Sequence, residues 1–148
     1  MTDVSDTIRE TKFTEFNDEQ IQFLDVNQTM ILAHLSRVGE ADATVVYYVR
    51  HANSLYVLTK NKTKKYHSLM SGEAVTAIVY DEATMTSLKM KAHPRAESDS
   101  HIRQDVFNHI SQKIGDGVGS LPIAQLDAGN YVVFRLRPIE ITFHNYSS

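Results

Sequence analysis

The chain has 148 residues, of which 42% are hydrophobic and 22% are charged, and its formal net charge is -3. This length suits one globular domain, and six Gly and three Pro are too few for a disordered or fibrous chain. The absence of Cys excludes disulfides, a thiolate nucleophile and Cys-ligated metal centres. No apolar run approaches the ~18 residues of a membrane-spanning helix. The polar N-terminus does not resemble a signal peptide, so we expect a cytoplasmic protein without a membrane partner.

The first predicted element is a short helix that follows a leader without a clear hydrophobic period. The leader covers residues 1–16 and is expected to be loose, which leaves residues 17–148 as the domain. Asn17 followed by Gln20 has the pattern of a helix N-cap and its N3 partner, and the helix should end near Val26. Runs rich in β-branched and aromatic residues then predict strands at 29–37, 43–50, 54–60, 74–81, 85–92 and 130–146.

Two more helices separate these strands. The first covers residues 63–71 and should end at Gly72, a residue type favoured just beyond a helix C-terminus. The second should begin after Ser98 as N-cap and continue to Ile114 with apolar residues at helical spacing. In the last strand, Pro138 predicts a bent or edge position. Six strands, mostly in hairpins, with three helices indicate an α+β domain built on a small antiparallel barrel or sandwich.

A basic segment joins the third strand to the second helix. Lys60, Lys62, Lys64 and Lys65 fall within six residues that contain no acid. Lysines in the first helical turn oppose the positive end of the helix dipole. A bound phosphate would make these lysines favourable, because its negative charge attracts them. It would also accept hydrogen bonds from backbone N–H groups, the ammonium groups and the hydroxyls of Thr59 and Thr63. A solvated lysine loop that aids solubility explains the same spacing, and the spacing does not decide between the two.

The segment 55–79 resembles the split barrel of the pyridoxamine 5′-phosphate oxidase-like proteins, which bind flavin mononucleotide (FMN). In that family a strand ends in a hydroxyl residue, and a Ser or Thr with an Arg or Lys pair follows four positions later. Thr59, Thr63, Lys64 and Lys65 match this order and spacing, and Leu58 falls where the strand backbone would touch the flavin. The resemblance implies a six-stranded antiparallel split β-barrel with short flanking helices, FMN as cofactor, and a homodimer with FMN at the subunit interface.

The sequence departs from the true oxidases of this family. They carry an Arg at the start of the second barrel strand, where Ala43 or Thr44 stands here, and a Trp-bearing segment beyond the last strand, whereas this chain has no Trp. We therefore do not expect an authentic pyridoxamine phosphate oxidase. The resemblance implies an oxidoreductase acting on an unidentified small substrate, with hydroxyls of Thr44 and Thr86 at the rim of the cofactor pocket. No side chain is singled out as catalytic.

Other functions have weaker support in the sequence. His101 and His109 are too far apart on one helix to share a metal ion and the other histidines are scattered, so no metal site is predicted. The alternative to an enzyme is a non-catalytic dimeric module, either a flavin-free scaffold or a binder of single-stranded nucleic acid. The lysine cluster with Tyr47, Tyr56 and Tyr66 would serve the latter. One basic cluster on a protein with a negative net charge attracts nucleic acid only weakly, so a nucleic-acid partner is not expected.

Overall fold

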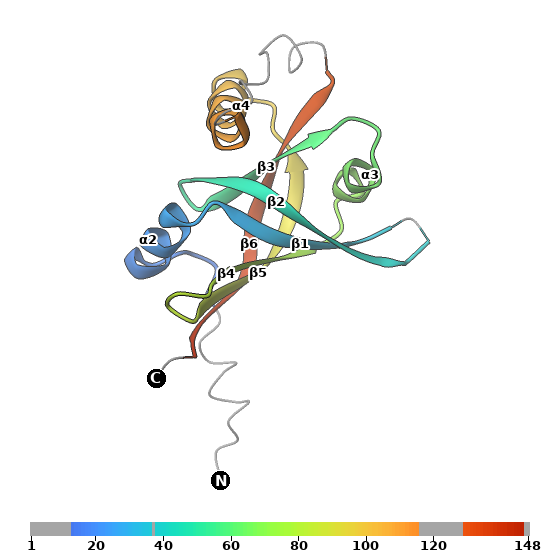
Figure 1. Ribbon diagram of the computed structural model, residues 1–148. Helices are drawn as coiled ribbons and strands as arrows, with labels where there is room; N and C mark the ends of the chain where they lie inside the picture. The colour runs from blue at the N-terminus through green and yellow to red at the C-terminus, as the bar shows by residue number, and fades with distance from the viewer. Residues whose placement is uncertain (1–12, 37, 116–128, 147–148) are drawn as a thin grey trace.

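The computed structural model describes residues 13–36, 38–115 and 129–146 and shows a closed antiparallel barrel (Figure 1). Around the barrel the strands follow the order β1-β2-β3-β6-β5-β4. This confirms the predicted α+β split barrel with short helices. No helix in the described part of the chain is long and apolar enough to cross a membrane. The strands are β1 (Thr29–Leu35), β2 (Ala41–His51), β3 (Ser54–Lys60), β4 (Val75–Asp81), β5 (Thr86–Ala96) and β6 (Tyr131–Asn145), and the helices are α2 (Asp18–Val26), α3 (Lys64–Met70) and α4 (Ser100–Gly115).

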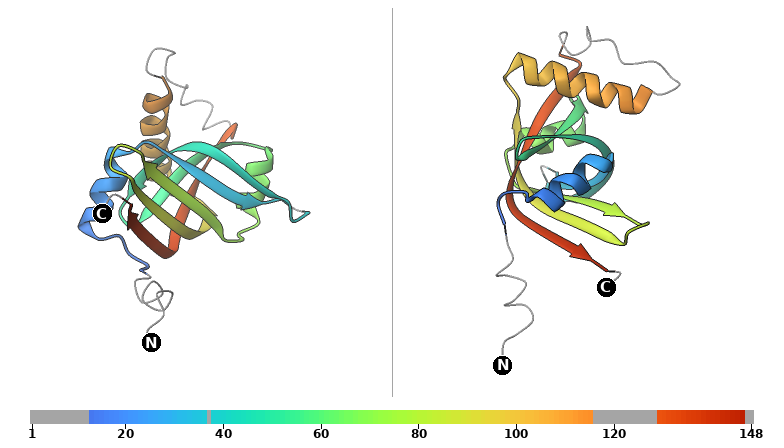
Figure 2. Two further views of the ribbon diagram at one scale, coloured as in Figure 1. Left: turned by 60° about the horizontal axis from the view of Figure 1, so that its bottom comes forward. Right: turned by 90° about the vertical axis from the view of Figure 1, so that its left-hand side faces the viewer.

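The barrel interior is filled by side chains that alternate along each strand. On β1, Met30, Leu32 and His34 are buried while their neighbours are more exposed, as a period of two requires. A second, smaller core lies outside the barrel where α4 packs against β2 and β3 (Figure 2). Its buried members are Tyr56, Val106, Phe107, Ile110 and Val133.

Strand β6 closes the barrel by pairing with β3 along one edge and β5 along the other. Its pairing with β3 stops at Leu136, so Pro138 lies where β6 pairs with β5 alone. The register between β5 and β6 shifts between Lys91 and Ala92, opposite this proline. Because Pro cannot donate to a strand ladder, this irregular position, where β6 has a partner strand on one side only, suits it, as the sequence predicts. Strand β5 continues to Ala96, beyond its predicted end at Ala92.

The helix ends follow local chemistry in most cases. Asn17 and Gln20 form the predicted capping box, with N–O distances of 2.9 and 3.0 Å. The Thr63 hydroxyl caps α3 by accepting from the Tyr66 N–H at 3.2 Å. Gly72 has a φ of 78° just beyond α3, a conformation that other residues rarely adopt. The predicted N-cap at Asn17 and the predicted helix stop at Gly72 are confirmed.

The predicted N-cap of α4 is wrong by one residue. Asp99, not Ser98, caps the helix, because its Oδ1 accepts from the N–H groups of His101 at 2.9 Å and Ile102 at 3.1 Å. The Glu97 carboxylate accepts from the N–H groups of both Ser98 and Asp99. This carboxylate holds Ser98 ahead of the helix, so α4 begins at Ser100.

The last residues of the predicted leader are attached to the barrel. The Phe13 carbonyl accepts from the Ile141 N–H at 2.7 Å, and the Phe16 N–H donates to the side chain of Asn53 at 2.8 Å. Phe16 is buried in the main core. Residues 13–16 are therefore attached to the barrel, and the rest of the expected loose leader, residues 1–12, lies outside the described residues.

Candidate ligand-binding site at the α3 end of the barrel

The barrel is split between β2 and β3 on the side that faces α3. The β2–β3 ladder ends at the pair Tyr48–Val57, and from Leu58 to Lys60 strand β3 pairs with β6 alone. The first half of β2 pairs only with β1. Figure 1 shows the two strands diverging towards α3. The edge of β3 at Leu58 is therefore free of a ladder partner from β2, at the residue for which the resemblance implies a flavin contact.

The two predicted threonines on this side have hydroxyls that are already engaged. Thr59 is buried, and its hydroxyl donates to the carbonyl of Val132 at a long 3.4 Å. The Thr63 hydroxyl donates to the Lys60 carbonyl at 2.9 Å while it caps α3. A hydroxyl has one proton. Either threonine would have to release its present acceptor before it could donate to a phosphate.

The lysines at the start of α3 carry charge that no carboxylate of the described residues neutralises in an ion pair. Lys64 is exposed and Lys65 is half-buried. Burial lowers the pKa of Lys65 below its ordinary value. Among the described residues no carboxylate forms an ion pair with either ammonium group; the recorded pair joins Arg50 and Asp25 elsewhere. An anion bound here would supply the missing opposite charge.

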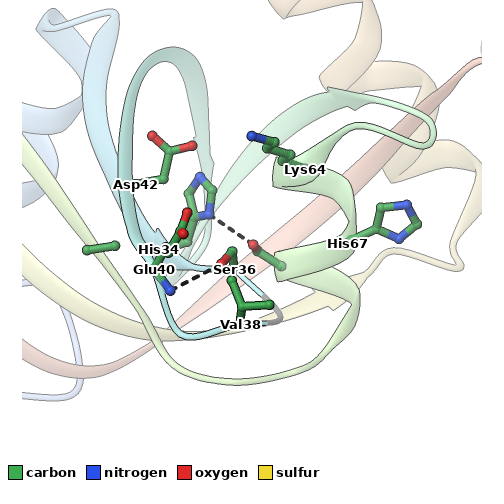
Figure 3. Close-up of a pocket in the computed structure, with 9 residues that line it drawn as sticks. His34, Ser36, Val38, Glu40, Asp42, Lys64 and His67 are labelled. Carbon is green, nitrogen blue, oxygen red and sulfur yellow. Dashed lines mark hydrogen bonds between the residues drawn. The ribbon is translucent and has the colours of Figure 1, made fainter.

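A cavity of about 520 Å³ lies between the β1–β2 hairpin and α3 (Figure 3). Its polar groups come from both walls: Asp42 and Glu40 from the hairpin side, and Lys64 and His67 from the helix. Figure 3 shows His34 lying between Asp42 and Lys64. The lining residues are His34, Ser36, Val38, Glu40, Ala41, Asp42, Lys64, His67 and Ser68.

His34 is held in one tautomer by a buried hydrogen-bond chain. Its Nδ1 lies 3.0 Å from the Ser68 hydroxyl, which itself donates to the Leu35 carbonyl at 2.8 Å. Because the single Ser68 proton is used there, His34 Nδ1 must be the donor to Ser68. Burial lowers the pKa of His34; nearby Asp42 opposes this shift and Lys65 adds to it. The ring is therefore neutral at pH 7, and Nε2 carries a lone pair.

This burial makes stability depend on pH. Between the lowered pKa of folded His34 and the unfolded value of 6.5, the unfolded chain binds more protons, so the free energy of unfolding rises with pH. One group contributes at most about 1.4 kcal/mol per pH unit. We expect His34→Gln to flatten the pH dependence of urea unfolding at and below pH 6.5, and His101→Gln, at an exposed position, to leave it unchanged. Identical slopes in the wild type and His34→Gln would contradict this account.

The two remaining predicted residues lie far from one another. Thr44 is on the first half of β2, and its hydroxyl is buried without a hydrogen-bond partner among the described residues. Thr86 begins β5 opposite Asp81, at the end of the barrel away from α3, and donates to the Thr84 carbonyl at 3.1 Å. Within one chain, Leu58, Thr59, Thr63, Lys64 and Lys65 lie together at one end, whereas Thr44 lies opposite Leu32 in the middle of β1 and Thr86 lies at the other end.

Sequence reasoning missed His34, Ser68 and Asp42. The contact between His34 and Ser68 joins residues 34 positions apart, and Asp42 comes next to His34 only through the pairing of β1 with β2. One local signal was available. His34 continues the inward-facing series of Met30 and Leu32, and a polar residue at an inward position needs a partner.

The structure also bears on the alternatives. Tyr56 is buried and donates to Glu97 at 3.3 Å, so its ring cannot stack on a base. Tyr66 packs edge-on against Phe134 in the core. A row of stacking tyrosines beside the lysines is therefore not formed. Within the described residues, no group of three or more His, Asp or Glu side chains could hold a metal ion.

Comparison with known proteins gives matches only at the level of structure. No family model matches the chain, and no curated protein matches it by sequence. A candidate pyridoxamine 5′-phosphate oxidase from Listeria innocua has a TM-score of 0.70 at 19% identity over 86% of this chain and 97% of its own. A FAD-binding protein from Mesorhizobium loti has a TM-score of 0.64 at 16% identity over 84% and 89%.

The same fold also occurs in a protein that is named for heme storage. The heme storage protein HutZ from Vibrio cholerae has a TM-score of 0.63 at 17% identity, covering 88% of this chain and 94% of its own. At such identities the likeness concerns the fold, and the fold carries more than one function. Taken with the six-stranded closed barrel and the β2–β3 split, these matches show that this chain has the split-barrel fold of the pyridoxamine 5′-phosphate oxidase-like proteins.

Proposed function

We propose that this protein binds FMN and acts as a flavin-dependent oxidoreductase on a small substrate. The observation that carries the proposal is the pair Lys64 and Lys65, whose charges have no carboxylate partner among the described residues and which follow the free edge of β3. The phosphate would lie against these lysines. The flavin ring would lie along the free edge at Leu58.

The residues present fit a phosphate better than a neutral group. Lys65 loses hydration through burial, which is the cause of its lowered pKa. A phosphate beside it would return the favourable interaction that water supplies elsewhere. The exposed Lys64 offers a second ammonium from the same helical turn. Charge-assisted hydrogen bonds of this kind are stronger than neutral ones.

In such a protein the flavin and the protein chain have separate roles. The bound flavin supplies the transfer of a hydride or of electrons. The residues of this chain bind the phosphate, position the ring beside β3 and exclude water from one of its faces. These roles need no side chain that acts as an acid or base. The absence of a catalytic assignment from the sequence agrees with that division.

The proposal is tested by comparing FMN with riboflavin, which lacks the phosphate. We expect the flavin-free protein to bind FMN at least about tenfold more tightly, since a hydrogen bond to a charged group contributes about 1.5–3 kcal/mol. Fluorescence titration with both ligands measures this ratio. Equal affinities would overturn the phosphate assignment.

Bleaching of bound FMN by NADH or NADPH tests the oxidoreductase activity, and no bleaching with either would favour a flavin-free or storage role.

We further propose that the outer face of β4, β1 and β2 forms a two-fold interface with a second copy of the chain. Ile31 lies opposite both Val45 and Ile78 in the strand register, so three apolar side chains cross the sheet in one row. Ile31 is 43% exposed and Val45 is 71% exposed. A contiguous apolar row on a sheet surface is typical of an association site.

Replacing Val45 by Asp should separate the two copies, because it would bury a charge in the interface. We expect a dimer for the wild type and a monomer for Val45→Asp in size-exclusion chromatography with light scattering. Ile139→Asp, at an exposed apolar position on β6, is the matched control and should remain dimeric. A monomeric wild type at all working concentrations would rule out the interface.

A further inference from the structure

We propose that the cavity between the β1–β2 hairpin and α3 is a binding site for a small organic cation with an N–H donor, such as a primary ammonium group. The cation would lie between the free ring nitrogen of His34 and the Asp42 carboxylate. The cation would use the His34 and Asp42 side of the cavity, whereas Lys64, which the proposed phosphate site uses, lines the opposite wall. Because Lys64 belongs to both, cation binding is measured with and without FMN.

The first support is a buried acceptor without a partner. His34 is 5% exposed, and its Nε2 has no hydrogen bond within the described residues. The Ser68–Leu35 chain fixes the proton on Nδ1, so the neutral ring presents only a lone pair at Nε2. A buried polar atom left unpaired costs about 1–3 kcal/mol. A ligand that donates to Nε2 would remove this cost.

The second support is the direction of that lone pair. His34 lines the cavity, and Figure 3 shows the ring nitrogen that is not bonded to Ser68 pointing towards the space between Asp42 and Lys64. Nε2 itself exposes less than 1 Å², so a ligand reaches it only when a neighbouring side chain moves. The side chains above it, Asp42 and Lys64, are exposed. Their exposure leaves both side chains room to change rotamer, and the proposal requires such a change to uncover Nε2.

The third support is the charge of the hairpin wall. Asp42 is close enough to His34 to raise its pKa against the effect of burial, and Glu40 lines the same wall. On this wall the Asp42 carboxylate and the lone pair of His34 favour a protonated amine, whereas Lys64 on the opposite wall and Lys65, whose charge lowers the pKa of His34, disfavour a cation close to α3. Val38 and Ala41 add apolar surface that suits a short alkyl chain. Together, the acceptor, the carboxylate and the apolar wall match an alkylammonium ion.

His34, Glu40, Asp42 and His67 all line the cavity, but no three of them are grouped so that they could hold one metal ion, which argues against a metal ion as the occupant. His34 and Asp42 would provide two ligands. No group of three or more suitable side chains exists in the described part of the chain. A stable divalent site normally uses more protein ligands than this. We therefore treat Zn²⁺ as a competing outcome of the test.

The test uses the purified full-length protein at constant ionic strength, with and without added FMN. The probes are n-butylammonium, the neutral 1-butanol and the anionic butyrate. For each probe, the ¹⁵N resonances of the His34 ring are followed by long-range ¹H–¹⁵N NMR. We expect n-butylammonium to shift the Nε2 resonance saturably, with an affinity in about the millimolar range for so small a ligand. Neither 1-butanol nor butyrate should produce the same shift.

Two variants separate the site from general charge attraction. Asp42→Asn should raise the dissociation constant roughly ten- to hundredfold, as expected when one charge-assisted hydrogen bond is removed. Glu82→Gln, in the exposed turn at the opposite end of the barrel, is the matched control and should leave it unchanged. An absent Nε2 shift at saturating amine, equal binding of butyrate, or an equal effect of both variants would overturn the proposal. Saturable Zn²⁺ binding that moves His34 while the amine does not would assign the site to a metal instead.

Discussion

Replacing Lys64 by Ala should weaken FMN binding by roughly ten- to hundredfold, the effect of one lost charge-assisted contact to phosphate. Lys64 is exposed and its side chain makes no hydrogen bond to the described residues, so loss of the side chain should not disturb the fold. Thr63 is a less suitable target because its hydroxyl also caps α3. A weaker affinity of Thr63→Ala for FMN would reflect both the lost contact to phosphate and the lost cap of α3.

The measurement is a titration of flavin-free Lys64→Ala with FMN and with riboflavin. Affinity for FMN should fall towards that for riboflavin, while riboflavin binding should stay constant. Lys89→Ala, an exposed lysine on β5, provides the control for a general change in charge. If Lys64→Ala and Lys89→Ala weaken FMN binding equally, the phosphate does not lie at the start of α3.

Replacing Phe107 by Ala should lower the free energy of unfolding by about 3–5 kcal/mol, as large-to-small changes of buried aromatics do. Phe107 is fully buried in the second core, where it packs edge-on against Tyr131. The substitution leaves a cavity between α4 and the barrel. This helix contacts the sheet mainly through β2 and β3, so the stability should be lost mainly through weaker packing of α4 on these strands.

Urea unfolding followed by circular dichroism measures the change. Phe13→Ala is the matched control, since Phe13 is 49% exposed and makes its β-bridge through its backbone. We expect that substitution to cost at most about 1 kcal/mol. If Phe107→Ala and Phe13→Ala lowered the free energy of unfolding equally, the packing of α4 would contribute little to stability.

The strands and helices were largely predictable because each rests on a local pattern. Inward-facing Met30 and Leu32 give β1 its period of two, and Asn17 with Gln20 specifies the start of α2. The error at α4 shows where local reasoning stops. Ser98 and Asp99 are both good N-caps, and Glu97 selects between them by binding the backbone of Ser98.

The candidate site divides in the same way. Thr59, Thr63, Lys64 and Lys65 lie close together in sequence, so their spacing could be matched to a family. The pairing of His34 with Ser68 depends on α3 packing across the end of β1, which no single-sequence pattern specifies. The placement of Thr86 at the other end likewise follows from strand direction and barrel closure.

The late position of β6 in the chain has a consequence for folding. Until the ribosome has released residues 131–145, strands β3 and β5 each present an open edge, and open edges pair with other chains. Closure then joins partners as distant as Leu55 and Leu136. Contacts of such high sequence separation slow folding to about milliseconds or seconds. Chaperone demand and aggregation should therefore peak during synthesis, and a fragment that ends before Tyr131 should aggregate rather than fold.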